Sequence, residues 1–376
     1  MKKYLLLFYS FLTTVAFSQT FVSTSVENKN VVIEEFTGIH CGFCPAGHLI
    51  AQNIQDAHPN DVTLINIHVG SYAEPAAGEP DFRTNWGVQV KNISGLTGYP
   101  AGQINRQQFS LPIEHSTSGK PAMSRSFWED AANTVLSEPS YVNVAAQANI
   151  NVPTRLLTVN VEAYYTGNGN SIDKLNVLLL QNNIPGPQSG AANHNPDAII
   201  SGPWNPTYNH QHMFRHSLTS YWGTTISSTT AGSFYSNTYT YTIPDSLNGV
   251  AYDLYNLEVV VFIADLQLDI ISGNKSSMYY ITSINETSNE KSFVKLYPNP
   301  IKEQGVIEFT LNVPADISFE IFDLIGKKVK EKTVTSQLNT GKLSFNLETK
   351  DLNNGSYILK YKIQDKISSI KFIVAK

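Results

Sequence analysis

The sequence predicts a multidomain, mostly β protein in which a short α/β domain precedes an antiparallel β-sandwich and a smaller C-terminal β-sandwich. Short segments of alternating apolar and polar residues, joined by turns rich in Gly, Pro and Asn, fill most of the chain after residue 140. Tyr (19) and Phe (18) far outnumber Met (4), which also favours strands. The 376 residues allow two or three domains of ordinary size.

Residues 1–18 are expected to be a secretory signal peptide. A short basic start, Met1–Lys3, precedes the apolar run 4–17, and Ala16-Phe17-Ser18 fits cleavage before Gln19. An uncleaved anchor is the alternative, but this run is shorter than the ~20 residues of a membrane-spanning helix. Since later apolar runs are shorter still, we expect no transmembrane span in the mature chain.

The charge distribution predicts a boundary near residue 290. Residues 21–290 carry 10 Lys and Arg against 22 Asp and Glu, whereas residues 291–376 carry 14 Lys against 9 Asp and Glu. The net charge of −5 makes a nucleic-acid partner improbable. The predicted parts are a signal peptide at 1–18 and three domains at 19–140, 141–288 and 289–376.

The first domain alternates strands and helices, and the later ones contain strands. Expected elements of the first domain are strands at 31–36, 62–68 and 102–105, and helices at 45–56, 81–90 and 124–136. Expected strands of the middle domain are 141–152, 156–165, 175–181, 238–243 and 257–264. Expected strands of the last domain are 306–311, 317–322, 328–334, 342–347, 355–363 and 366–374.

Cys41 and Cys44 are the only cysteines, and they form one Cys-Gly-Phe-Cys unit. In an exported chain a disulfide is expected. Two cysteines do not complete a structural zinc site, and Pro45 stands where a c-type haem motif needs histidine. A disulfide across so short a loop adds little entropic stabilisation, which favours a redox role.

Cys41 lies between a predicted strand and a predicted helix. The positive end of a helix lowers the pKa of a thiol, and the thiolate is the nucleophile of disulfide exchange. In this interpretation Cys41 attacks and Cys44 resolves the mixed disulfide. The alternative is an inert disulfide inside a binding module.

These residues resemble the thioredoxin superfamily. The resemblance implies that Glu35, six residues before Cys41, moves a proton, and that Pro100 in Gly98-Tyr99-Pro100 is the cis-proline facing the disulfide. Structural alternatives are a strand-end role for Glu35 and an ordinary trans peptide at Pro100. The chain departs from the family at His40, Phe43 and Pro45. These departures leave the reduction potential of the disulfide and the direction of electron flow open. His40 is an electrostatic candidate for stabilising the thiolate.

Residues 183–236 are rich in histidine and aromatic side chains. A metal interpretation of His210, His212 and His216 lacks accompanying carboxylates, so a structural or surface role is favoured. A carbohydrate or peptide contact surface is a further alternative. No metal or cofactor is predicted.

Residues 30–285 resemble the 28-kDa outer-membrane-protein-related family of the Bacteroidota. The motifs that carry the resemblance are Val32–Gly38 leading into Cys41, Cys44 and Pro45, then 98–102, 105–106, 208–215 and 259–265. The resemblance implies a thioredoxin-like domain fused to a sandwich and a location at the outer membrane or cell surface. A spanning barrel is not indicated, because the necessary series of lipid-facing strands is missing.

Residues 296–376 resemble the type A C-terminal sorting domain of the type IX secretion system. The matching pieces are Leu296–Pro300, Asp323-Leu324-x-Gly326-Lys327, Gly355-x-Tyr357-x-Leu359 and Lys371–Val374. The resemblance implies contact with the secretion machinery through 296–376, passage through the periplasm and removal of the domain, with the remainder released or anchored at the surface. An accessory β-module is the alternative.

Two functional hypotheses follow. The first is a surface or secreted thiol–disulfide oxidoreductase that acts on protein thiols or disulfides through Cys41, Cys44, Glu35 and Pro100. The second is a surface binding or adhesion protein in which the disulfide is structural. Exposure of Cys41 and a lowered thiol pKa would distinguish them.

Overall fold

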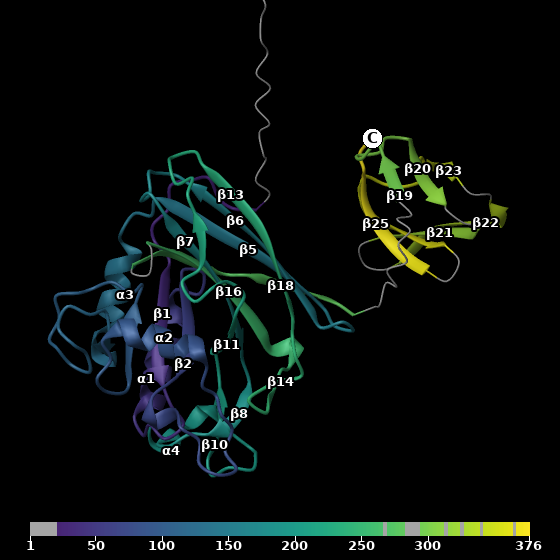
Figure 1. Cartoon of the computed structure of the whole chain (residues 1–376). Coiled ribbons are helices and arrows are strands. Elements are labelled where there is room, and N and C mark those ends of the chain that lie inside the picture. The colour runs from purple at the N-terminus through teal and green to yellow at the C-terminus, as the bar shows by residue number, and fades with distance from the viewer. Residues whose placement is uncertain are drawn as a thin grey trace, which may run out of the picture. The chain divides into compact units, whose positions relative to one another are not determined.

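The computed structural model describes residues 21–265, 269–282, 294–311, 315–323, 327–338, 341–363 and 366–376. The chain divides into two compact units, Met1–Ser283 and Ile284–Lys376, and each unit is treated by itself. The predicted signal peptide lies outside the described residues. Strands dominate both units, which confirms the mostly β prediction (Figure 1).

The first unit opens with alternating strands and helices. Strands β1 and β2 are parallel, β3 is antiparallel to β1, and β4 is antiparallel to β3. The elements are β1 (Val31–Thr37), α1 (Cys44–Ala57), β2 (Val62–His68), η1 (Ser71–Ala73), α2 (Asn85–Ser94), β3 (Ala101–Ile104), β4 (Met123–Ser124), η2 (Arg125–Phe127) and α3 (Trp128–Leu136).

Helix α2 starts four residues later than the sequence predicted. The Thr84 hydroxyl accepts a hydrogen bond from the Gly87 amide at 3.1 Å and caps the helix. Gly95, with φ 74°, ends it after Ser94. The prediction of 81–90 was therefore wrong at both ends, although Lys91–Ser94 continue the same amphipathic pattern.

The remaining strands of the first unit build the sandwich half. A four-stranded sheet has the order β13-β6-β5-β18, and β18 pairs parallel to β5. The elements are β5 (Val142–Asn151), β6 (Leu156–Tyr165), β7 (Asp173–Gln181), β8 (Ile184–Pro187), α4 (Ala191–His194), η3 (Pro196–Ala198), β9 (Ile199–Ile200), β10 (Thr207–His210), β11 (Met213–Ser217), β12 (Thr224–Ile226), β13 (Phe234–Thr242), β14 (Ser246–Leu247), β15 (Val250–Ala251), η4 (Leu254–Asn256), β16 (Leu257–Asp265), β17 (Ile270–Lys275) and β18 (Ser277–Ile281).

One long sheet joins the two halves of this unit. Its order is β17-β16-β7-β11-β2-β1-β3-β4, with β12 paired to β7. The joint is the parallel contact between β11 and β2, where the Asn66 amide donates to the His212 carbonyl at 2.8 Å. The boundary predicted at residue 140 lies between α3 and β5 within this unit, and it stays a prediction.

Strand β7 lies between two hydrophobic cores. Val177 and Leu179 face the core formed with β5 and β6, whereas Leu178 and Leu180 face the core formed with β1, β2 and α2. Successive side chains on a strand point to opposite faces, so a strand buried on both faces needs an unbroken apolar run. Helices α1 and α3 form a third core on the other side of β1 and β2.

The described residues of the second unit form a small sandwich around a core that contains Ile307, Phe319 and Phe372. Its sheets have the orders β19-β20-β23 and β22-β21-β24-β25. The strands are β19 (Val294–Tyr297), β20 (Gln304–Leu311), β21 (Ala315–Asp323), β22 (Lys328–Leu338), β23 (Gly341–Glu348), β24 (Gly355–Ile363) and β25 (Lys366–Val374). All six strands predicted here are present. Leu324 and Gly326 of the predicted motif lie outside the described residues.

Across the described parts of both units, no helix has the length and apolar character needed to cross a bilayer.

Candidate functional site around the Cys41–Cys44 disulfide

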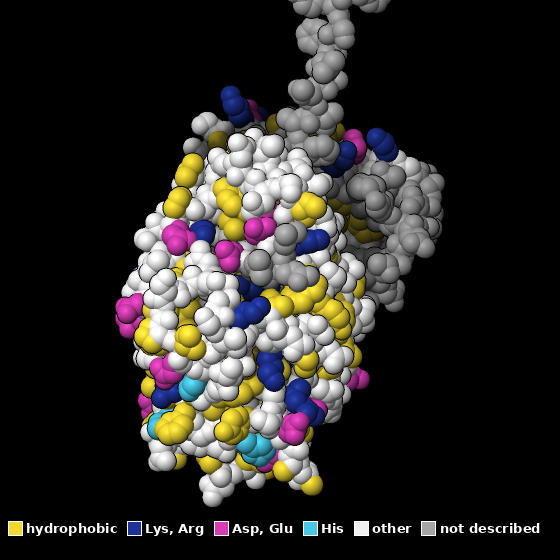
Figure 2. All heavy atoms as spheres, turned by 60° about the vertical axis from the view of Figure 1, so that its left-hand side comes forward, with side chains coloured by type: hydrophobic (Ala, Val, Ile, Leu, Met, Phe, Trp, Pro, Cys, Tyr) yellow, Lys and Arg dark blue, Asp and Glu magenta, His cyan; other side chains and the backbone are white. Residues whose placement is uncertain are grey.

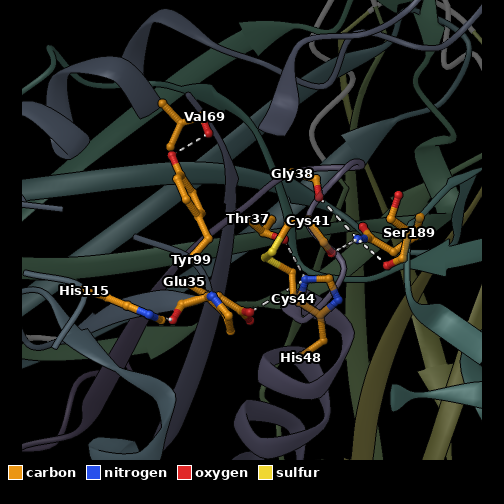
Figure 3. The surroundings of a disulfide bond; sticks show 12 residues. Glu35, Thr37, Gly38, Cys41, Cys44, His48, Val69, Tyr99, His115 and Ser189 are labelled. Carbon is orange, nitrogen blue, oxygen red and sulfur yellow. Dashed lines mark hydrogen bonds and ion pairs between the residues drawn. A yellow bond between two sulfur atoms is a disulfide. The ribbon is translucent and has the colours of Figure 1, made fainter. Parts of the chain in front are cut away.

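Cys41 and Cys44 form a disulfide at the point where β1 leads into α1. Cys44 is the first residue of the helix, and Pro45 follows it in the first turn, where a proline costs no intrahelical hydrogen bond. The Cys44 amide donates to the Cys41 carbonyl at 3.3 Å. The helix predicted from residue 45 is confirmed, and it brings its positive end to the cysteine pair (Figure 3).

Two consecutive buried glutamates on β1 have opposite surroundings. The Glu34 carboxylate accepts hydrogen bonds from Arg106 (Nε, 2.7 Å; Nη2, 2.5 Å) and from Gln103 (2.6 Å). The side chain of Glu35 points to the other face of the strand. Among the described residues neither of its oxygens has a hydrogen-bond partner, although the residue is 0% exposed. The unpaired carboxyl is therefore on the helix α1 side of the sheet.

Burial raises the pKa of Glu35 well above its ordinary value, and the positive charge of Arg125 opposes this shift only in part. Its Oε1 lies 3.7 Å from His48 Nε2. Burial also disfavours the charged form of His48, and it lowers the pKa of this side chain to about 4. Burial therefore favours the uncharged form of both side chains, and in its uncharged form Glu35 is a carboxylic acid with a proton to give.

The Tyr99–Pro100 peptide bond is cis, as the sequence predicted. A Cβ on Gly47 would lie 2.6 Å from Glu35 Oε1 and 3.2 Å from Pro100 Cβ. Helix α1, the buried acid and the proline loop therefore meet at Gly47. His115 Nδ1 lies 2.9 Å from the Pro100 carbonyl oxygen and holds the loop from the other side (Figure 3).

His48 connects the disulfide helix to the sandwich half. Its Nε2 is 2.9 Å from Thr37 Oγ1, and its Nδ1 is 3.0 Å from the Tyr208 hydroxyl. The Tyr208 oxygen accepts a further bond from Asn195 Nδ2 at 3.0 Å. Both ring nitrogens thus have partners. A cavity of about 290 Å³ adjoins this chain of polar groups, lined in part by His48, Tyr208 and His210.

Residues 187–195, which we call the strap, lie against the Cys-Gly-Phe-Cys turn. Gln188 Nε2 donates to the carbonyls of Gly38 (3.2 Å) and Cys41 (3.0 Å), and the Ser189 amide donates to the carbonyl of Ile39 (2.8 Å). Figure 3 shows Ser189 beside Cys41. Cys41 is only 3% exposed and Cys44 is 0% exposed, so the disulfide is covered in this conformation.

The histidines highlighted in the sequence lie in separate surroundings. His40 Nε2 is 3.0 Å from Glu79, His212 Nδ1 is 3.0 Å from Glu258, and the His216 ring stacks on Tyr241. His210 instead contacts Tyr208, with 5.0 Å between the ring centroids. The structure therefore does not bring His210, His212 and His216 together. In the described part of the chain no group of three His, Cys, Asp or Glu side chains could hold a metal ion.

Helix α1 carries Cys44 and, one turn later, Gly47, which lies against both Glu35 and Pro100. The catalytic roles of Cys41, Cys44, Glu35 and Pro100 stay a prediction. Sequence reasoning missed the strap and the role of Tyr208, which are about 150 residues from the cysteines in the chain. The only signal in that region was its unusual density of His, Tyr and Trp. This signal indicated a contact surface without identifying what it contacts.

Comparison with known families identifies both units. Residues 88–276 match the family described as outer membrane protein Omp28, and residues 295–375 match the secretion system C-terminal sorting domain. These matches define an exported protein that is sorted by type IX secretion. Such a protein is secreted, held at the cell surface or associated with the outer membrane. The chain belongs to the Omp28 outer membrane protein family. Its match begins after Cys44, so membership alone says nothing about the disulfide.

Solved structures resemble the chain only weakly. Protein AGR_C_4864 from Agrobacterium tumefaciens is 12% identical, with 70% of this chain and 98% of that chain covered and a TM-score of 0.38. The FN1–FN3 domains of chicken CNTN1 are 13% identical, with 61% and 65% covered and a TM-score of 0.17. Trypsin-activated alpha-2-macroglobulin from Escherichia coli is 10% identical, with 62% and 18% covered and a TM-score of 0.18. Similarity at this level does not identify a shared fold. No curated protein matches the sequence.

Proposed function

We propose that this exported protein catalyses thiol–disulfide exchange at Cys41–Cys44. The observation that carries the proposal is the Glu35 carboxyl, which is buried, without a hydrogen-bond partner in the described structure and packed against Gly47 on the disulfide helix. Burying an unpaired carboxyl is unfavourable, and such groups concentrate at functional sites. The order β2-β1-β3-β4, with α2 on one face and α1 and α3 on the other, further supports a thioredoxin-like arrangement.

The proposed step conserves electrons and protons. A thiolate of a substrate dithiol attacks Cys41 Sγ, the new S–S bond forms, and Cys44 leaves with the electron pair of the old bond. Glu35 gives its proton to the Cys44 thiolate and later regains one from water. The second substrate thiolate then displaces Cys41, whose thiolate is stabilised at the start of α1 until it is protonated by water. The substrate ends as a disulfide, and the protein ends with two thiols.

A second function is favoured by one observation. Cys41 is 3% exposed, and reactive cysteines are ordinarily accessible. In this alternative the protein is a surface binding or adhesion protein, and the disulfide only fixes the turn between β1 and α1.

The reduction potential separates the two functions. The mature protein is equilibrated with glutathione buffers, and its free thiols are alkylated and counted by mass spectrometry. A potential of roughly −120 to −270 mV is expected for an exchange catalyst. A potential below about −300 mV would mark a structural bond and favour the binding protein. As a matched check, Cys44→Ser should accumulate a mixed disulfide at Cys41, whereas Cys41→Ser should not.

A further inference from the structure

The strap makes one main-chain hydrogen bond of the kind that a bound peptide makes, together with two bonds from a side chain. Ser189 donates its amide to the Ile39 carbonyl, and the Gln188 side chain binds two carbonyls of the same turn. Gly190 lies against Gly42: with φ +74°, a Cβ at Gly190 would be 1.8 Å from the Gly42 carbonyl oxygen. The chain therefore approaches the residues between the cysteines as closely as backbone atoms allow.

The far end of the strap is attached to the buried polar groups behind the disulfide. The ring of His194 contacts the ring of Phe43 with 5.0 Å between the centroids, although Phe43 is 57% exposed. Asn195 Nδ2 donates to the Tyr208 hydroxyl, which contacts His48. Figure 2 shows hydrophobic and histidine side chains side by side at the lower end of this unit, the end where Figure 1 has α4, β8 and β10.

We propose that residues 187–195 are a built-in gate, in which Gln188 and Ser189, just before helix α4, occupy the place of a polypeptide substrate over Cys41. This inference rests on the proposed exchange function. The substrate class that follows is a protein segment that replaces Gln188 and Ser189 and offers its own amide to the Ile39 carbonyl. Exchange then requires the strap to leave, because in the closed conformation Cys41 is covered.

Gly190→Ala tests the gate directly. The added methyl group cannot fit against Gly42, so the strap must open more often. Gly232→Ala is the matched control, because Gly232 has φ +85° and nothing within 4 Å of its Cβ position. The measurement is the second-order rate of disulfide reduction by excess thioredoxin and by excess dithiothreitol. We expect Gly190→Ala to accelerate reduction by thioredoxin about fivefold or more, the equivalent of losing one net hydrogen bond of closure.

Gln188→Ala is a second variant that should make the strap open more often, and it adds no bulk. It keeps the test valid if Gly190→Ala does not fold. It removes the bonds to Gly38 and Cys41 and should also accelerate reduction. Rates equal to those of the unaltered protein and of Gly232→Ala would overturn the gate. The reduction potential tests the exchange function independently. A potential below about −300 mV combined with faster reduction of the opened variants would show that the strap covers the disulfide, but it would refute exchange and with it the role of the strap as a substrate gate.

Discussion

At the scale of single residues, the most informative contrast is between Glu34 and Glu35. Both are fully buried neighbours on β1, yet Glu34 is paired with Arg106 and Glu35 lacks a hydrogen-bond partner in the described structure. A buried ion pair with well-formed hydrogen bonds can be purely structural. A buried unpaired acid is held in its neutral form, and that form is useful when a thiolate must be protonated.

Glu35→Gln should change how stability depends on pH. The pKa of Glu35 is raised in the folded state, so between the unfolded pKa near 4.5 and the folded pKa the native state binds the extra proton. The stability that Glu35 contributes is therefore present below pH 4.5 and is lost as the pH rises through the folded pKa. We expect the free energy of unfolding of the unaltered protein, relative to Glu35→Gln, to fall across this window, measured by urea denaturation.

The same substitution should slow exchange most below the folded pKa of Glu35, where the protonated side chain would otherwise give its proton to Cys44. Glu114→Gln is a suitable control, because Glu114 is exposed on a loop. Parallel stability curves for Glu35→Gln and the unaltered protein between pH 4.5 and 9 would contradict the assignment of a raised pKa.

The sequence could identify the residues that belong to one short motif. Cys41 and Cys44 form one short motif, and the resemblance of this motif to thioredoxins is what pointed to Glu35 and to Pro100 in Gly98-Tyr99-Pro100. Partners such as Gln188 and Tyr208 could not be found this way. Their contacts depend on how distant strands pair, and a single glutamine or tyrosine in a loop carries no signal of its destination.

At the scale of elements, β7 holds the first unit together. The sequence predicted this strand from its apolar run, and the structure confirms it. The sequence could not reveal that one face of β7 packs on the sandwich sheet and the other on α2. An unbroken apolar run indicates only that both faces of the strand are buried, and it does not identify the element that covers each face.

Leu179→Ala and Leu180→Ala should therefore destabilise the same cooperative unit. Each removes a fully buried side chain from a different core, and each should lower the free energy of unfolding by about 2–5 kcal/mol. Both variants should shift a single thermal transition of residues 19–282, followed by circular dichroism. Leu156→Ala, at a 37% exposed position, should change stability by no more than about 0.5 kcal/mol. Two transitions, each moved by only one of the core variants, would show that the halves unfold separately.

At the scale of the whole molecule, folding and export are assigned to different parts of the chain. Each compact unit has its own hydrophobic cores, and the C-terminal unit carries the match to the sorting domain. The sequence predicted a boundary near residue 290 because the charge balance changes sign there, and the charge balance of a segment does not depend on long-range pairing. The strands of the second unit could also be predicted from the sequence, because apolar and polar residues alternate regularly within each short segment.

Removal of residues 283–376 should abolish export without unfolding the first unit. The truncated protein is expected to keep its thermal transition within about 2 °C, because its cores contain no residue from the second unit. In a host with type IX secretion it should accumulate in the periplasm, measured by cell fractionation and immunoblotting. Full-length Cys41→Ser is the control and should still be exported, since the disulfide lies outside the sorting domain. Surface delivery of the truncated protein would contradict this division, as would failure of residues 284–376 to export an unrelated periplasmic protein to which they are fused.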